Sequence, residues 1–145
     1  MDEFLIRRER MVSEQIEQRG IHSPALLAAM RSVPRHLFIP ADLRENAYSD
    51  YPLPIGNSQT ISQPYIVAYM TDLLDLTGSE KVLEVGTGSG YQAAVLSLLA
   101  KEVHTIEFLP TLTARAAEVL RDLGYSNVIV HQGDGSLGWL PEAPY

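Results

Sequence analysis

The chain has 145 residues, no cysteine and a formal net charge of −7 at pH 7. Its length fits a single domain that is large enough to bury a core. The missing cysteines exclude disulfides, thiolate catalysis and cysteine-ligated zinc. The acidic balance disfavours a nucleic-acid partner, because phosphate binding draws on lysine and arginine.

The sequence shows no targeting or membrane signal. Its first eight residues lack the charged-then-apolar order of a signal peptide. No apolar run approaches the roughly 20 residues that a membrane-spanning helix requires. We therefore expect a cytoplasmic protein with no membrane partner.

Residues 1–50 are predicted to form a helical segment. Residues 2–19 fit an amphipathic helix that ends at Gly20. Its apolar face would comprise Leu5, Val12 and Ile16. A second helix is predicted between the N-cap Ser23 and Pro34.

Helical periodicity is lost between residues 40 and 64, where proline, glycine, asparagine and serine accumulate. We predict a loop of about two dozen residues, a length typical of functional or disordered segments. Its many apolar residues argue against disorder. Residues 51–65 are the candidate acceptor and cofactor loop. A helix is expected over residues 65–74, with Pro64 at its first turn.

The most informative stretch is residues 81–91, where a short apolar run predicts a buried parallel strand and then breaks into glycines. The glycines are Gly86, Gly88 and Gly90, and the acidic residue before them is Glu84. A dinucleotide fingerprint requires its third glycine at position 91, where this chain has Tyr91, so a pyrophosphate site is disfavoured. A G-x-G-x-G turn after an acidic residue is the pattern of S-adenosylmethionine-dependent methyltransferases. A helix is expected over residues 91–100.

A second predicted strand, residues 102–106, ends in Glu107. An acidic side chain at this position can accept hydrogen bonds from both ribose hydroxyls, which indicates an adenosine-containing ligand without choosing one cofactor. A third unit follows, with a helix from Pro110 to Gly124 and a strand over residues 127–130.

The third unit closes on Gly133, Asp134 and Gly135. Asp134 could occupy a plain turn. At the carboxyl end of a parallel strand it could instead accept a hydrogen bond from an adenine amino group.

The four histidines show no metal-ligand spacing. They are His22, His36, His104 and His131. We predict that they are structural or surface residues, that the protein has no metal site, and that Trp139 is a packing residue.

The loop gives a more specific signal than the glycines. The run PIGNSQTISQPY (residues 54–65) resembles the signature loop of the protein-L-isoaspartate (D-aspartate) O-methyltransferases. Residues 82–92 are similar to that family's first cofactor motif, and residues 133–135 to its adenine-contacting turn. Residues 33–38 resemble a further family segment, so the resemblance covers essentially the whole chain.

The resemblance implies methyl transfer from S-adenosylmethionine to the α-carboxylate of L-isoaspartyl residues in damaged proteins and peptides. The ester can collapse to a succinimide and reopen as aspartate, which is a repair function. Ser62, with Thr60, would be the catalytic pair. The cofactor-binding set would be Thr60, Ile61, Ser62, Glu84, Gly86, Gly88, Gly90, Glu107, Asp134 and Gly135. On the residues alone, Ser62 could equally be a hydroxyl that caps the following helix.

We expect one α/β domain over residues 1–145 with a Rossmann-like class I methyltransferase fold. It would have a parallel sheet with flanking helices, preceded by the N-terminal helices. Residues 66–145 would form the cofactor-binding βαβαβ portion, with three strands in the order 3-2-1 and the C-terminal strands missing. We therefore expect the N-terminal portion of a longer, monomeric enzyme, weakly stable or inactive alone because its first strand has an unpaired edge.

Three other functions are alternatives to the repair hypothesis. Another S-adenosylmethionine-dependent methyltransferase is disfavoured by the loop over residues 59–64. A noncatalytic cofactor-binding fragment is favoured by the missing strands and disfavoured by the hydroxyl-rich loop. A nicotinamide oxidoreductase is disfavoured by Tyr91.

Overall fold

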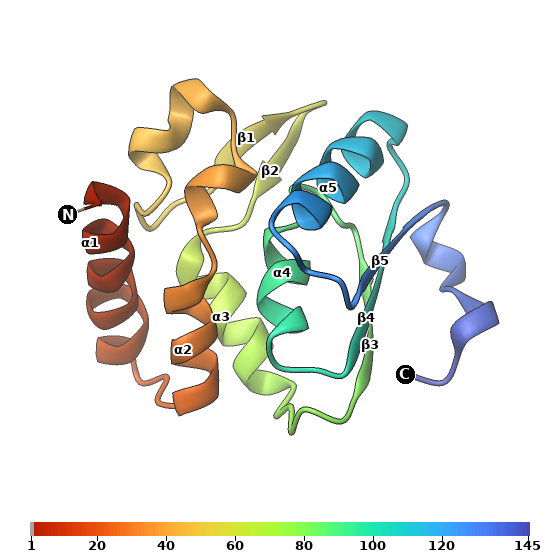
Figure 1. Cartoon of the computed structure of the whole chain (residues 1–145), viewed down its shortest axis with the longest axis horizontal. Coiled ribbons are helices and arrows are strands. Elements are labelled where there is room, and N and C mark those ends of the chain that lie inside the picture. Colours follow the sequence, from red (N-terminus) through yellow and green to blue (C-terminus); the bar gives the residue numbers. More distant parts are fainter. Residues whose placement is uncertain (1) are drawn as a thin grey trace. The chain divides into compact units, whose positions relative to one another are not determined.

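The computed structural model describes residues 2–145 (Figure 1). The chain forms two compact units, one up to Asp75 and the other over Leu76–Tyr145. Each unit has its own secondary structure and buried core, and each is described by itself.

The first unit begins with a helical run in three parts. These are the α-helix α1 (Glu3–Arg10), a π-helical segment (Met11–Ile16) and a 3-10 turn (Glu17–Arg19). The side chain of Asp2 caps α1 by accepting a hydrogen bond from the Phe4 amide. The run ends at Gly20 in the left-handed conformation, as the sequence predicts.

One residue of the predicted apolar face is misplaced. Val12 and Ile16 are fully buried, but Leu5 is 39% exposed. The buried face is centred nearer Met11, and Phe4 turns inward to stack on His36 with ring centroids 4.2 Å apart. Leu5 therefore lies at the edge of the apolar stripe.

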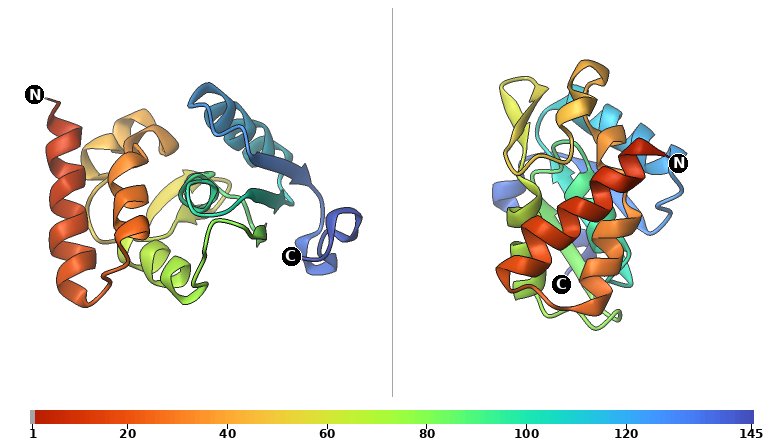
Figure 2. Two further views of the ribbon diagram at one scale, coloured as in Figure 1. Left: turned by 60° about the horizontal axis from the view of Figure 1, so that its bottom comes forward. Right: turned by 90° about the vertical axis from the view of Figure 1, so that its left-hand side faces the viewer.

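The second helix, α2 (Pro24–Ser32), forms as predicted. The Ser23 hydroxyl accepts a hydrogen bond from the Leu26 amide, and Pro24 occupies the first turn. Figures 1 and 2 show α2 in orange beside α1 in red. Two 3-10 helices follow, Arg35–Phe38 and Ala41–Asn46.

The prediction of a structureless loop between residues 40 and 64 is wrong in part. Besides the second 3-10 helix, this stretch holds an antiparallel hairpin of β1 (Leu53–Gly56) and β2 (Gln59–Ile61). Asn57 and Ser58 form its turn with φ of 53° and 56°, as a two-residue hairpin turn requires. The strands are too short to show a clear alternating pattern in the sequence, and β1 contains both a proline and a glycine. The helix α3 (Pro64–Leu73) then starts as predicted.

The second unit is a three-stranded parallel sheet with the order β3-β4-β5, as predicted. Its strands are β3 (Lys81–Val85), β4 (Glu102–Glu107) and β5 (Val128–Gln132). Val103 of the central strand pairs with Val82 on one side and with Val128 on the other. The crossover helices are α4 (Tyr91–Ser97) and α5 (Pro110–Asp122). Two 3-10 turns complete the unit, Gly135–Leu137 and Leu140–Glu142.

The core of the second unit lies between this sheet and its helices. Every residue of β4 after Glu102 is buried, and so is every residue of α4 except Gln92. The buried residues of α5 recur every four positions, at Leu112, Ala116 and Leu120. Within residues 2–145, β3 is hydrogen-bonded to β4 alone, and Val85 is 59% exposed. No helix in that range is long and apolar enough to cross a membrane.

Leu112→Ala should lower the free energy of unfolding by about 2–5 kcal/mol, because it opens a cavity where the side chain is 1% exposed. Leu137→Ala is the matched control, since Leu137 is 75% exposed and its truncation should change stability by less than about 0.5 kcal/mol. Urea unfolding followed by circular dichroism measures both. Equal effects of the two substitutions would contradict this core.

Candidate functional site

A glycine turn follows β3. Gly86, Gly88 and Gly90 all have positive φ, at 91°, 54° and 89°. Gly90 is the N-cap of α4, and a Cβ there would lie 3.3 Å from the Leu120 side chain, so packing also requires glycine. A Cβ on Gly86 would meet no atom within 4 Å. The turn therefore leaves open space beside Gly86, which fits the approach of a ligand to the backbone.

Glu107, at the end of β4, ties this turn to the next strand-helix connection. Its Oε1 accepts a hydrogen bond from the Gly88 amide at 2.9 Å, and its Oε2 accepts one from the Leu109 amide at 2.9 Å. The residue is 7% exposed. Because a carboxylate offers about four lone-pair sites, it can still accept from ligand hydroxyls while it holds both amides.

Asp134 and Gly135 follow β5 at the same edge of the sheet. Oδ1 of Asp134 accepts from the amide and the hydroxyl of Ser136, and these bonds hold the pKa of the exposed Asp134 carboxyl below its ordinary value. A Cβ on Gly135 would lie 2.4 Å from Cγ1 of Val85. Glycine is therefore required for the close approach of this turn to the end of β3.

Backbone hydrogen bonds join these turns. The Gly86 amide donates to the carbonyl of Ile106 at 2.8 Å, and the Gly133 amide donates to the carbonyl of Glu107 at 3.0 Å. The structure thus brings the predicted glycines, Glu107 and Asp134 together at the carboxyl edge of the parallel sheet. This is the edge at which open α/β sheets bind ligands.

Glu84 is placed differently from the other acids, because its carboxyl belongs to a hydrogen-bonded row inside the second unit. The Thr105 hydroxyl donates to Oε1 of Glu84 at 2.6 Å, and the hydroxyl oxygens of Thr105 and Thr87 lie 2.6 Å apart. Burial raises the pKa of Glu84 to about 8, against the opposing effect of the Thr105 hydrogen bond. The sequence offered no signal for the two threonines, because neither Thr105 inside β4 nor Thr87 in the glycine turn belongs to a pattern of its own.

The predicted loop residues lie in the first unit, on and after β2. Thr60 on β2 and Ser62 directly after it are both exposed, whereas Ile61 between them is 4% exposed. The N-cap of α3 is Gln63 and not Ser62. The carbonyl of Ser62 accepts a hydrogen bond from Nη2 of the buried Arg35 at 2.8 Å, a contact that the sequence did not predict.

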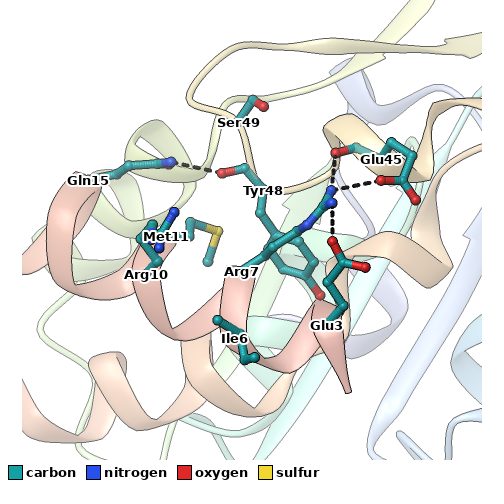
Figure 3. A pocket seen from close by; sticks show the side chains of 9 residues that line it. All are labelled: Glu3, Ile6, Arg7, Arg10, Met11, Gln15, Glu45, Tyr48 and Ser49. Atoms are coloured by element: carbon teal, nitrogen blue, oxygen red, sulfur yellow. Dashed lines mark hydrogen bonds and ion pairs between the residues drawn. The ribbon is translucent and has the colours of Figure 1, made fainter. Parts of the chain in front are cut away.

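The first unit also holds a cleft of about 520 Å³ beside α1, and neither Thr60 nor Ser62 is among the residues that line it (Figure 3). Arg7 lies at its centre and is paired with the carboxylates of Glu3 and Glu45. The Gln15 side chain donates to the carbonyl of Tyr48. Because the charge of Arg7 is already balanced by two carboxylates, the cleft lacks the character of an anion site.

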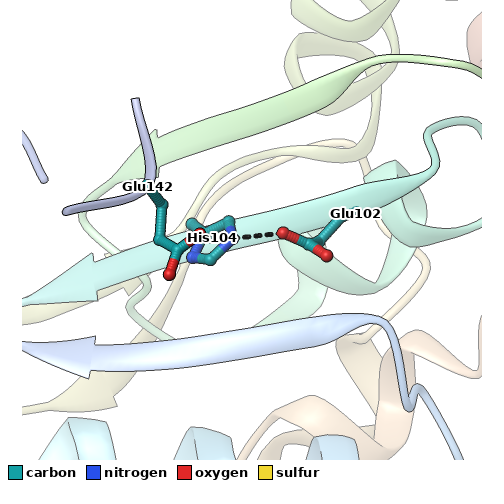
Figure 4. A group of neighbouring side chains, drawn as sticks. All are labelled: Glu102, His104 and Glu142. Carbon is teal, nitrogen blue, oxygen red and sulfur yellow. Dashed lines mark hydrogen bonds and ion pairs between the residues drawn. The ribbon is translucent and has the colours of Figure 1, made fainter. Parts of the chain in front are cut away.

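A further cluster lies on the sheet, where Nε2 of His104 is 2.6 Å from Oε1 of Glu102 and near the carboxylate of Glu142 (Figure 4). Ligand atoms of these three residues lie within 4.8 Å of one another, a geometric grouping that sequence spacing missed because Glu142 is remote in the chain. Nδ1 of His104 bonds to His131, and Nζ of Lys81 lies 3.6 Å from the Glu142 carboxylate. The ammonium group of Lys81 therefore already provides a positive charge beside the Glu142 carboxylate.

Solved structures of known proteins resemble this chain in fold. A solved protein-L-isoaspartate O-methyltransferase superposes with a TM-score of 0.85 at 29% identity, over 95% of this chain and 45% of that one. The beta-aspartate methyltransferase (PCMT) of Plasmodium falciparum, in complex with S-adenosyl-L-homocysteine, matches with a TM-score of 0.69 at 24% identity, over 85% of this chain and 61% of that one. The fold is therefore that of the class I methyltransferases.

The sequence match is closer still. The family described as Protein-L-isoaspartate(D-aspartate) O-methyltransferase (PCMT) matches residues 6–145. Protein-L-isoaspartate O-methyltransferase 1 of Syntrophobacter fumaroxidans is 59% identical over 145 residues, which are 100% of this chain and 68% of that protein. The chain belongs to this family. It spans 68% of the length of this relative and 58% of the length of Protein-L-isoaspartate O-methyltransferase 1 of Rhodopseudomonas palustris.

The raised pKa of Glu84 predicts a pH-dependent stability. The folded state holds this proton up to about pH 8, whereas the unfolded chain releases it near pH 4.5, so stability should fall as the pH rises between these values. The loss should amount to a few kcal/mol at most, since one pKa unit is worth about 1.4 kcal/mol. Glu84→Gln should flatten this slope in urea unfolding at a series of pH values.

Glu118→Gln is the control for this series, because Glu118 is exposed on α5. Its slope between pH 5 and pH 8 should match that of the unchanged chain. A slope that Glu84→Gln leaves equally steep would contradict the burial of a neutral Glu84.

Proposed function

We propose that this chain supplies the cofactor site and the acceptor loop of an enzyme that repairs damaged proteins. The enzyme would transfer a methyl group from S-adenosylmethionine to the α-carboxylate of L-isoaspartyl residues. Its substrates would be damaged proteins and peptides that contain such residues. The observation that carries the proposal is the glycine turn clamped by Glu107, in a chain whose family membership extends over residues 6–145.

The residues of the second unit fit the cofactor. Glu107 would accept the ribose hydroxyls, and Asp134 with Gly135 would meet the adenine. The open space beside Gly86 leaves the backbone free to lie under the methionine portion. When bound, S-adenosylmethionine supplies a methyl group that its sulfonium already activates. The crystallised relative from Plasmodium falciparum holds the demethylated product of the same compound.

The residues of the first unit would serve the acceptor. Thr60 and Ser62 are exposed, and their hydroxyls can donate to a substrate carboxylate. An ionised carboxylate is already a nucleophile, so no general base is required. Orientation alone can contribute roughly 7 to 11 kcal/mol in well-aligned reactions. We infer that these hydroxyls act by holding the carboxylate in register.

A second candidate is cofactor binding without turnover by this chain alone. The observation that favours it is the open edge of β3, where Val85 is 59% exposed. On this view methyl transfer requires residues that the relatives have beyond the region they share with this chain. We further propose that the protein is a cytoplasmic monomer. Sedimentation of the purified chain would give its mass and so test whether it is a monomer.

Glu107→Gln should weaken the binding of S-adenosylmethionine by about 10- to 100-fold, because an amide nitrogen cannot accept the hydrogen bond that a carboxylate oxygen accepts. Isothermal titration calorimetry of the 145-residue chain measures the Kd. Glu118→Gln is the matched control and should bind like the unchanged chain. Equal affinity of the two variants would remove Glu107 from the site.

The acceptor is tested with two peptides that differ only in one L-isoaspartyl or L-aspartyl residue. The enzyme is the chain fused after Tyr145 to the remaining residues of the Syntrophobacter fumaroxidans relative, and radiolabelled S-adenosylmethionine supplies the methyl group. We expect label on the isoaspartyl peptide alone, and little or none from the unfused chain. Ser62→Ala should slow the reaction of the fusion by about 10- to 100-fold.

Ser32→Ala is the control for that variant, because Ser32 is an exposed serine whose hydroxyl bonds to the carbonyl of Ala28 in its own helix. Equal labelling of both peptides would contradict the proposed acceptor. Cofactor binding without label on either peptide, even in the fusion, would select the noncatalytic candidate.

A further inference from the structure

We propose that Arg35 is a positioning residue that fixes the main chain at Ser62 and thereby aims the exposed hydroxyl. The inference rests on the proposed function, in which Ser62 holds the acceptor carboxylate. Arg35 would act through Ser62 and would not touch the substrate.

The first observation is the burial of Arg35. Its relative exposure is 0%, and among the described residues it is the largest side chain that is fully buried. An isolated buried cation costs several kcal/mol, so such a group persists only where polar partners hold it. Arg35 begins the 3-10 helix Arg35–Phe38, directly after Pro34.

The second observation is the nature of its partners, which include two main-chain carbonyls on separate segments. Nε donates to the carbonyl of Ala47 at 2.6 Å, and Nη2 donates to the carbonyl of Ser62 at 2.8 Å. Ala47 follows the 3-10 helix Ala41–Asn46, and Ser62 follows β2. A planar guanidinium can span two such acceptors at once, whereas a lysine ammonium lacks the fork. Arg35 therefore pins the end of the hairpin to the core of the first unit.

The restraint falls on a residue whose neighbours are also fixed. Ile61 is 4% exposed and anchors the chain on one side of Ser62. On the other side, the carbonyl of Gln63 accepts from the Val67 amide in the first turn of α3. Ser62 thus has a fixed backbone and an exposed side chain. This combination suits a group that must hold a reactant in line, because a displacement of about 1 Å can cost about 100-fold in rate.

Three variants test the inference. Arg35→Lys keeps the charge but cannot span both carbonyls, and Arg35→Ala leaves a space that added methylguanidinium can fill. Arg31→Ala is the matched control, because Arg31 makes two ion pairs, with Glu9 and Glu17, and no contact of Arg31 with the hairpin is among those described. Hydrogen exchange on the 145-residue chain reports the order of residues 59–66. The kcat of the fused enzyme reports whether the Ser62 hydroxyl is correctly oriented.

We expect Arg35→Lys to speed exchange over residues 59–66 by about tenfold while α1 and α2 stay protected. In the fusion, kcat should fall by about 100-fold with little change in the KM for S-adenosylmethionine. Methylguanidinium should restore part of the activity of Arg35→Ala, and Arg31→Ala should keep kcat within about twofold of the unchanged enzyme.

Unchanged exchange at residues 59–66, or a kcat no lower than that of Arg31→Ala, would overturn the proposal. Uniform loss of protection in both Arg35 variants would also overturn it, because Arg35 would then be a folding residue. If the unaltered fusion methylates neither peptide, the proposed function fails. The exchange result still decides whether Arg35 orders Ser62.

Discussion

The carboxylate of Glu107 is the constraint on which the candidate site depends. One side chain at the end of β4 holds the Gly88 amide of the turn after β3 and the Leu109 amide before α5. Without this double contact, a turn of three glycines with positive φ would have large conformational freedom. The clamp keeps that turn in one shape while the glycines keep its surface open. A rigid but open backbone is what close binding of a ligand requires.

The two units use charged side chains in complementary ways. In the second unit, Glu107 accepts from main-chain amides and orders the predicted cofactor turn. In the first unit, the guanidinium of Arg35 donates to the carbonyls of Ala47 and Ser62 and orders the predicted acceptor loop. Both side chains are buried, whereas an exposed surface ion pair would contribute little to stability. Both act on backbone groups next to residues that we propose to contact a ligand.

Much of the second unit could be predicted from the sequence. Its strands are rich in valine, leucine and isoleucine, its helices have a clear period, and glycines mark its turns, so local rules suffice for the strand order and for the grouping of Gly86, Glu107 and Asp134. The first unit was harder to predict. The hairpin of β1 and β2 depends on pairing across a tight turn and not on alternation. The outward position of Leu5 depends on how the side chains next to it pack into the core.

The contacts that sequence reasoning missed join residues far apart in the chain. Arg35 lies 27 residues from Ser62, and Glu142 lies 38 residues from His104. No periodicity links such positions, because only the packed fold brings them together. The row of Thr87, Thr105 and Glu84 is likewise a product of strand pairing. Local patterns therefore predicted most of the elements and which candidate residues gather at the edge of the sheet, whereas the contacts among them required the structure.

The most direct test of the cofactor site is a titration of the ¹⁵N-labelled 145-residue chain with S-adenosylhomocysteine, followed by the backbone amide signals. If the clamped turn is the site, the shifts should concentrate at residues 86–91, 107–109 and 133–136. The amides of Gly88 and Leu109, which Glu107 holds, should be among the most affected. Unshifted signals in these three stretches at saturating ligand, or shifts concentrated elsewhere, would contradict the assignment.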